Sequence, residues 1–302
     1  MEITLQALTS LFLGLKKIYM DALSETATPE IGRLVYQDRA ITTTDEYPAS
    51  GLLGDLEEHL DELHMINMWE MLQRAKPILF DGAIPVKRLH ILNDQIGVYE
   101  NAIRELGEAT KTHPYRNVAR CLMNGFTTVW LPDGQNIFSN DHAWPGGQGW
   151  DNLEHLPLTA GNFDIACQHL EMRARPDGQP LGMVPRLLLV GPLNRANAET
   201  IIEMQLIGGG NTNRQYKRCE LLVEPRINTL NWFVIDDERP PIVNDLREGP
   251  ATDSQISNDS DHVFTRNEYR FKAWVNYVLA ILQPWRIQAS DWEEGDTTTT
   301  AA

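Results

Sequence analysis

The sequence predicts an α+β protein, and three observations support that class. Apolar residues recur at steps of three and four over 3–23 and 94–125, which is the spacing of amphipathic helices. Between 269 and 279 apolar and polar residues alternate one by one, as in a long β-strand. Helical and strand-like stretches are interspersed without regular strand–helix–strand alternation, so a doubly wound parallel sheet is not expected.

The composition of the 302 residues is that of an ordinary globular chain. Hydrophobic residues make up 42% and charged residues 23%, which excludes a disordered or collagen-like protein. The 42 acidic and 26 basic residues give a net charge of −16, which argues against a protein that coats nucleic acid. No apolar run reaches the roughly 18 residues of a membrane span, and no secretory signal is evident. Three widely spaced cysteines indicate no disulfide framework and a reducing compartment, so a cytoplasmic site of synthesis is expected.

The first expected element is an amphipathic helix over residues 3–23. Its apolar stripe consists of Leu5, Leu8, Phe12, Leu15, Tyr19 and Ala22. Two interpretations fit this stripe: it docks on the core of its own chain, or the helix is an arm that packs on a neighbouring subunit. Residues 24–56 are rich in Thr, Ser, Pro and Gly and predict a connecting segment with at most short strands.

Residues 57–90 are expected to be extended and hairpin-like. Asp81-Gly82 is a dipeptide suited to a tight turn. The apolar side chains of the segment are Met65, Ile66, Met68, Trp69, Ile78, Leu79, Phe80 and Ile84. They are too few for a core, and an isolated hairpin is at best marginally stable, so we expect the segment to lie against something else.

The strongest helical signal runs from 94 to 125. His113-Pro114 predicts a kink or the start of a second helix, and Gly125 predicts the C-terminal cap, so one long, broken helix is expected. The later elements are expected to be a turn-rich loop at 126–150, helices at 161–174 and 194–206, a flexible loop at 207–211, strands at 186–190, 219–223, 231–235 and 269–279, and a polar, disordered tail at 291–302.

The best candidate for chemistry is the loop that holds Asp133, Asn136, Asp141 and His142. These side chains are suited to acid–base work or metal binding, which would make the chain a cytoplasmic hydrolase. The surrounding turn residues favour another role, in which the same side chains hold loop backbone by hydrogen bonds. We therefore expect a structural loop and keep the hydrolase as the alternative.

The other candidate motifs do not fit known chemistry. His59 and His64 are five residues apart, whereas a zinc-binding helix needs a spacing of four. Asp236-Asp237-Glu238 follows a strand and is expected to be an exposed turn. Gly208-Gly209-Gly210 lacks the Lys-Ser/Thr ending of a phosphate loop. The cysteines lie in apolar contexts typical of inert buried thiols. No catalytic residue, metal or cofactor is therefore predicted.

The order of elements and several motifs resemble a known family. The motifs are Asp94-Gln95-Ile96-Gly97-Val98-Tyr99, His113-Pro114, Gly125-Phe126-Thr127-Thr128, Asp133-Gly134-Gln135-Asn136-Ile137-Phe138, Asp141-His142, Thr43-Thr44-Asp45-Glu46-Tyr47, and the last strand through Tyr277 into Pro284-Trp285. Together they resemble the major head subunit of Mu-like bacteriophages, the shell-forming capsid protein of the Hong Kong 97-type fold. The resemblance covers essentially the whole chain.

The resemblance implies a role for each segment of the chain. The implied segments are an N-terminal arm (1–40), a connecting segment (41–56), an extended loop that lies across a neighbour (57–90), a peripheral domain with a long spine helix (91–159), an axial domain (160–258), a return strand of the peripheral domain (259–290) and a flexible tail (291–302).

The resemblance also implies a function. The chain is expected to self-assemble into pentamers and hexamers that form the icosahedral shell of a virion around double-stranded DNA, without sequence-specific binding. Assembly is expected in the host cytoplasm, with a scaffolding protein and a portal as partners. Whether a decoration protein also binds is left open. The expected assembly-interface residues are Leu8, Phe12, Met68, Trp69, Phe80 and Gly209. Neither enzymatic activity nor membrane binding is expected.

Overall fold

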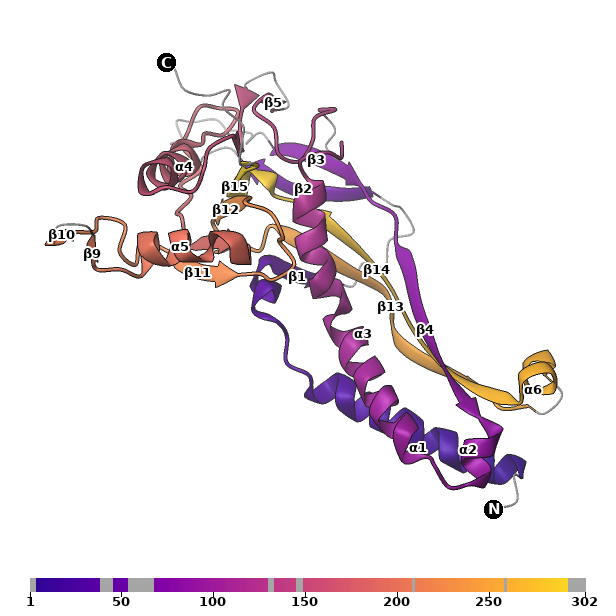
Figure 1. Cartoon of the computed structure of the whole chain (residues 1–302). Helices are drawn as coiled ribbons and strands as arrows, with labels where there is room; N and C mark the ends of the chain where they lie inside the picture. The colour runs from indigo at the N-terminus through magenta and orange to yellow at the C-terminus, as the bar shows by residue number, and fades with distance from the viewer. Residues whose placement is uncertain are drawn as a thin grey trace, which may run out of the picture.

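A computed structural model describes residues 4–38, 46–53, 68–129, 133–144, 149–207, 210–257 and 260–292, with backbone alone for 38, 46–53, 68–74, 207 and 261. Figure 1 shows an elongated part, in which long strands run beside two helices, joined to a second part with shorter strands and helices. Helices and strands are interspersed along the chain, as the α+β class predicts. Among the described helices, none is both long and apolar enough to cross a bilayer.

The elongated sheet has the strand order β1-β13-β14-β4. Its strands are β1 (Val35–Asp38), β4 (Ile78–Lys87), β13 (Ile242–Gln255) and β14 (Glu268–Ile281). The short helix α6 (Asp261–Arg266) connects β13 to β14, which pair antiparallel over most of their length. Burial alternates along most of β14, so the alternating pattern predicted for 269–279 is confirmed.

Two helices lie side by side along this sheet (Figure 1): α1 (Leu5–Glu25) and α3 (Gly97–Asn124), the latter preceded by the short α2 (Arg88–Leu92). Thr4 caps α1 by accepting a hydrogen bond from the Ala7 amide at 3.2 Å. The two helices approach closely at Gly107, where a Cβ atom would lie 2.8 Å from the carbonyl oxygen of Tyr19. The missing side chain of Gly107 therefore permits this packing.

The predicted break in the long helix is wrong. Pro114 lies inside α3, which continues without interruption for 28 residues. Proline removes one backbone donor, but the helix is held by its packed face, which includes Val118 and Leu122, both fully buried. Gly125 is the C-cap, as predicted, but its φ of −60° is right-handed, so conformational freedom is not the reason for glycine. A Cβ there would lie 2.7 Å from the ring of Phe138, so close packing is the reason.

The short-stranded sheet has the order β11-β8-β12-β15-β7. Its strands are β7 (Leu153–Glu154), β8 (Leu187–Val190), β11 (Glu220–Val223), β12 (Trp232–Ile235) and β15 (Ile287–Ser290). The central strands β8, β12 and β15 are buried throughout. One face packs on the C-terminal half of α3, and the other packs on α4 (Ala160–Met172) and α5 (Arg195–Ile202).

The helix expected at 194–206 is shorter than predicted. A 3-10 turn, η2 (Pro192–Asn194), precedes α5, which ends at Ile202. The buried side chain of Asn213 donates hydrogen bonds to the carbonyl oxygens of Thr200, Ile201 and Met204, at 3.3, 2.8 and 2.7 Å, and so terminates the helix. After it, β9 (Leu206–Ile207) and β10 (Asn211–Thr212) pair antiparallel.

The hairpin expected within 57–90 also needs correction. β3 (Met68–Arg74) pairs antiparallel with β2 (Glu46–Leu53), and β4 adds to β14 instead of to β3. Asp81-Gly82 is therefore not a turn. Both residues lie in the middle of β4, where the Asp81 carboxylate pairs with Lys272 of β14 at 2.8 Å.

The predicted segment boundaries do not coincide with the sheets. β13 falls within 160–258 but belongs to the elongated sheet, while β15 falls within 259–290 and belongs to the short-stranded sheet. The boundary between 159 and 160 separates β7 from the sheet that it joins. Strands distant in sequence complete each sheet, which a linear division of the chain does not capture. The remaining elements are the 3-10 turns η1 (Glu30–Leu34) and η4 (Pro284–Arg286) and the short strands β5 (His142–Ala143) and β6 (Gly149–Trp150).

Candidate assembly surfaces

The loop from Asp133 to His142 is built as a structural element. His142 is 1% exposed, and its Nδ1 lies 2.7 Å from Asp133 Oδ2 while its Nε2 lies 3.2 Å from the carbonyl oxygen of Ile137. The ring stacks on Trp150 with centroids 4.1 Å apart. Since both ring nitrogens face acceptors within the protein and the ring is buried, the imidazole holds the loop together, which is the structural role that the turn residues favour.

The other predicted chemical candidates give no site in the part of the chain that the structure describes. Burial raises the pKa of each of the three thiols to about 12, so they are poor nucleophiles; they are Cys121, Cys167 and Cys219. No group of three metal-binding side chains occurs among the described residues. Asp236 is not an exposed turn residue as predicted, because it is 1% exposed and accepts hydrogen bonds from Arg186 and Arg286. His59, His64, Gly208 and Gly209 lie outside the described residues.

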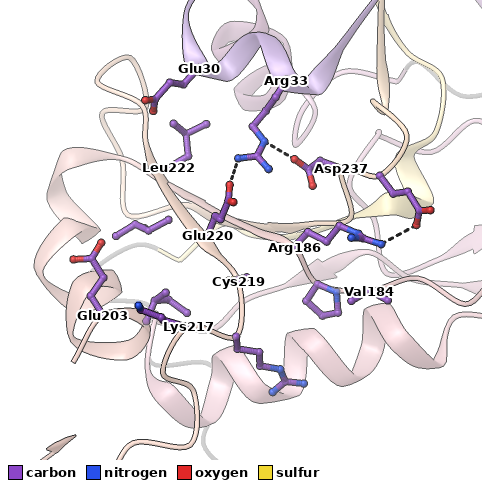
Figure 2. Close-up of a pocket in the computed structure, with 15 residues that line it drawn as sticks. Glu30, Arg33, Val184, Arg186, Glu203, Lys217, Cys219, Glu220, Leu222 and Asp237 are labelled. Carbon is purple, nitrogen blue, oxygen red and sulfur yellow. Dashed lines mark hydrogen bonds and ion pairs between the residues drawn. The ribbon is translucent and has the colours of Figure 1, made fainter. Parts of the chain in front are cut away.

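A groove of about 1340 Å³ lies beside strand β11 (Figure 2). Arg33 of η1 pairs there with both Glu220 and Asp237. Burial works to lower the pKa of Arg33, but the two carboxylates raise it above its ordinary value, and Arg33 lowers the pKa of Glu220 in turn. Arg186 pairs with Glu238 at 3.0 Å. Three carboxylates of the groove, those of Glu220, Asp237 and Glu238, are therefore paired with arginines.

Two of the predicted assembly-interface residues, Leu8 and Phe12, pack inside the subunit, and a third, Phe80, is partly covered by it. Leu8 and Phe12 are 1% and 4% exposed, and Phe12 meets the ring of Tyr269 edge-on at 6.5 Å. Phe80 is half-buried and stacks on Tyr277 at 5.0 Å. Leu8 and Phe12 therefore contact their own chain in the subunit, whereas an interface role for Phe80 stays a prediction. For α1, the interpretation in which the stripe docks on its own core is the right one.

Met68 and Trp69 lie on β3, in the hairpin that β2 and β3 form. Among the described strands, this pair bonds to no other sheet. Two strands alone are marginal in water, so the hairpin needs a surface to cover it. We call residues 46–74 the β2–β3 hairpin segment. Gly209, the last predicted interface residue, lies outside the described residues.

A second candidate surface was not found from the sequence. At the far end of the elongated part, the amide of Arg88 donates to the carbonyl oxygen of Asn267 at 3.0 Å, which places α2 beside the end of α6. Exposed apolar side chains lie on α2, on α6 and at the start of α3; they are Leu89 (63% exposed), Leu92 (43%), Phe264 (85%) and Val98 (68%). We call this set the distal apolar surface. Because α2 and α6 are distant in sequence and each is short, periodicity gives no signal for it.

Comparison with known proteins identifies the family. The model of the family described as Mu-like prophage major head subunit gpT matches residues 8–156 and 150–227. A search of curated proteins finds no match. Among solved structures, the procapsid of bacteriophage JBD30 is similar, with a TM-score of 0.55 and 20% identity over 98% of this chain and 78% of that chain.

Two further solved structures agree. The JBD30 capsid decorated with minor capsid protein trimers gives a TM-score of 0.58 and 19% identity over 67% of this chain and 92% of that chain. Gordonia phage Cozz gives 0.52 and 14% identity over 89% of this chain and 88% of that chain. These likenesses show that the fold is the Hong Kong 97-type fold of phage capsids. Since the family model covers more than half of the sequence, the chain belongs to the Mu-like prophage major head subunit family and is a capsid-forming protein.

Proposed function

We propose that copies of this chain form pentamers and hexamers that close into the icosahedral shell of a phage head around double-stranded DNA. The observation that carries this proposal is the β2–β3 hairpin segment, which bonds to no other described strand of its own subunit. A hairpin of this kind gains stability when a second surface covers it. In a shell, the adjacent copy supplies that surface.

The proposal assigns a role to each part of the subunit. The β2–β3 hairpin segment is the extended loop that lies across a neighbour, with Met68 and Trp69 as its contact residues. The elongated sheet with α3 forms the peripheral domain, and the short-stranded sheet with α4 and α5 forms the axial domain. The arm role of α1 then falls on its outward side, where Leu5 and Leu13 are 63% and 62% exposed. Of the predicted tail, residues 293–302 lie outside the described residues.

The wider partners follow from the same proposal. A scaffolding protein and a portal take part in assembly, which occurs in the host cytoplasm. The decorated JBD30 capsid carries minor capsid protein trimers, and it supports a decoration protein as a further partner. The net charge of −16 suits a shell that encloses DNA without adhering to it. We propose no enzymatic role, because the groups of the Asp133–His142 loop are committed to each other.

The decisive experiment replaces the β2–β3 hairpin segment with a Gly-Ser linker. We expect a soluble subunit whose thermal unfolding midpoint stays within about 3 °C of the parent, because the segment adds no strand to either large sheet. Particle yield, measured by sedimentation and negative-stain microscopy, should fall to background. Trp69→Ala is the milder variant, since aromatic side chains often dominate interfaces.

Val129→Ala is the matched control, because Val129 is apolar, 59% exposed and outside the segment. It should leave both measurements unchanged. Loss of cooperative unfolding together with particles in the linker variant would show that the hairpin belongs to the fold of its own subunit, contrary to the proposal.

A further inference from the structure

Each open strand edge of the elongated sheet is blocked against further strands over part of its length. β4 is one edge strand, and Pro85 within it has no amide hydrogen to donate. β13 has β1 beside it only from Ile242 to Asp245; beyond that, its exposed edge carries Pro250 and two shifts of register between Leu246 and Ala251. Proline and bulges are the usual means of preventing edge-to-edge association.

The edge of the short-stranded sheet at β11 has no such protection. The strand Glu220–Val223 contains neither proline nor a register shift, and its described partner is β8 alone. The amides of Glu220 and Glu224 donate to β8 and the residue before it, at 2.8 and 2.9 Å. Because alternate residues of a strand face opposite sides, the amides and carbonyls of Leu221 and Val223 point away from β8.

The groove of Figure 2 runs beside this edge. Glu30 and Leu222 border it on one side, and Glu203 and Lys217 border it on the other. Within the described residues, Glu30, Glu203 and Lys217 make no ion pair, whereas Glu220, Asp237 and Glu238 all pair with arginines, so two carboxylates remain against one ammonium group. The groove therefore suits an extended segment that bears apolar side chains and a cation.

The start of β4 in a second copy has this chemistry. Ile78 and Leu79 are 56% and 55% exposed on an edge strand, and the exposed Lys76 precedes them. Pro85 confines any new pairing to the first half of β4. This half also follows directly on the β2–β3 hairpin segment, so it is continuous with the part of the chain that is proposed to meet the neighbour.

We propose that the outer edge of β11 in one copy pairs with the first half of β4 in a second copy. The inference rests on the proposed assembly. The contact joins two different surfaces of identical chains, and such heterologous contacts generate rings when the rotation between copies closes. In this pairing, attraction of Lys76 of the incoming strand to Glu30 and Glu203 would set the direction of the contact.

Cysteine cross-linking tests the pairing. One chain carries Ile78→Cys or Leu79→Cys, a second carries Leu221→Cys or Val223→Cys, and the two are mixed, assembled and treated with a mild oxidant. The native thiols are buried, so they should not form cross-links. We expect disulfide-linked dimers in mixtures of the two chains and not in either chain alone. Val129→Cys with Val223→Cys is the control and should give no dimer.

Amide hydrogen exchange supplies an independent readout within one strand of unaltered protein. Assembly should lower the exchange rates of the Leu221 and Val223 amides by at least about 100-fold. The Leu222 amide should be protected from exchange both before and after assembly. Particles that form without cross-links, or with Leu221 and Val223 still exchanging rapidly, overturn the β11–β4 contact and leave the proposed function intact. An unaltered chain that forms no particles overturns both.

Discussion

His142→Ala is expected to destabilise the subunit without removing any activity. The substitution removes the contact of Nδ1 with the Asp133 carboxylate at 2.7 Å and that of Nε2 with the Ile137 carbonyl at 3.2 Å, and a neutral imidazole donates to only one of these two acceptors. A hydrogen bond to a charged group contributes about 1.5–3 kcal/mol, and an aromatic stacking contact such as that with Trp150 about 0.5–1.5 kcal/mol. The Asp133 side chain, 9% exposed, also loses its partner. The expected loss is about 2–4 kcal/mol in the free energy of unfolding.

Differential scanning calorimetry measures this loss as a shift in melting temperature. The entropy of unfolding is about 2.1 cal/mol/K per residue, or roughly 0.6 kcal/mol/K for a chain of this length. The midpoint should therefore fall by about 3–6 °C.

His155→Ala is the matched control, because it removes another histidine–carboxylate contact, 2.6 Å from Asp291, at a side chain that is 51% exposed. An exposed pair contributes at most about 1 kcal/mol. Equal shifts for the two variants would refute the argument from burial. A metal ion bound stoichiometrically at the loop would refute the structural role itself.

Three further predictions follow from close packing, the tail and the thiols. Gly107→Ala should lower the free energy of unfolding by about 1–3 kcal/mol in chemical denaturation, because the added Cβ would lie 2.8 Å from the Tyr19 carbonyl oxygen. Gly14→Ala is the control: its Cβ would have no atom within 4 Å, and the change should raise the free energy of unfolding by about 0.5–1 kcal/mol. Equal effects of the two variants would contradict the close packing at Gly107. Truncation after Glu294 should leave particle yield unchanged in sedimentation, and failure to assemble would make the tail an interface element. The three thiols have pKa values of about 12 and are buried, so at pH 8 fewer than one thiol per native chain should react with an aromatic disulfide reagent. All three should react after denaturation. Rapid reaction of the native protein would contradict the burial of the thiols.

The sequence predicts those features that depend on local periodicity. The stripe of α1 and the alternation of β14 follow from residues a few positions apart, so both elements could be placed within a few residues. Periodicity shows that a face is apolar but does not show what covers it. For this reason Leu8 and Phe12 were expected at an interface, although they pack against α3 and β14 of their own chain.

Strand partners are the main feature that the sequence does not reveal. Asp81-Gly82 has the chemistry of a turn, but β14 offers a long partner strand and Lys272 pairs with the Asp81 carboxylate. That contact joins residues far apart in the chain, so no local pattern contains it. In the Asp133–His142 loop, turn chemistry did indicate a structural role, because the partners lie within ten residues of each other. The stacking of His142 on Trp150 was not predictable in this way.

The pairing of β13 with β14 determines where the subunit bends. Each strand has 14 residues, or about 45 Å when extended, and the two are bonded from the short-stranded sheet almost to α6. A force applied at the α6 end is therefore transmitted to the other sheet along this hydrogen-bonded strand pair. The register shifts between Leu246 and Ala251 interrupt the ladder near its middle. Bulges bend and twist strands, so we expect the curvature of these two strands to concentrate at the register shifts.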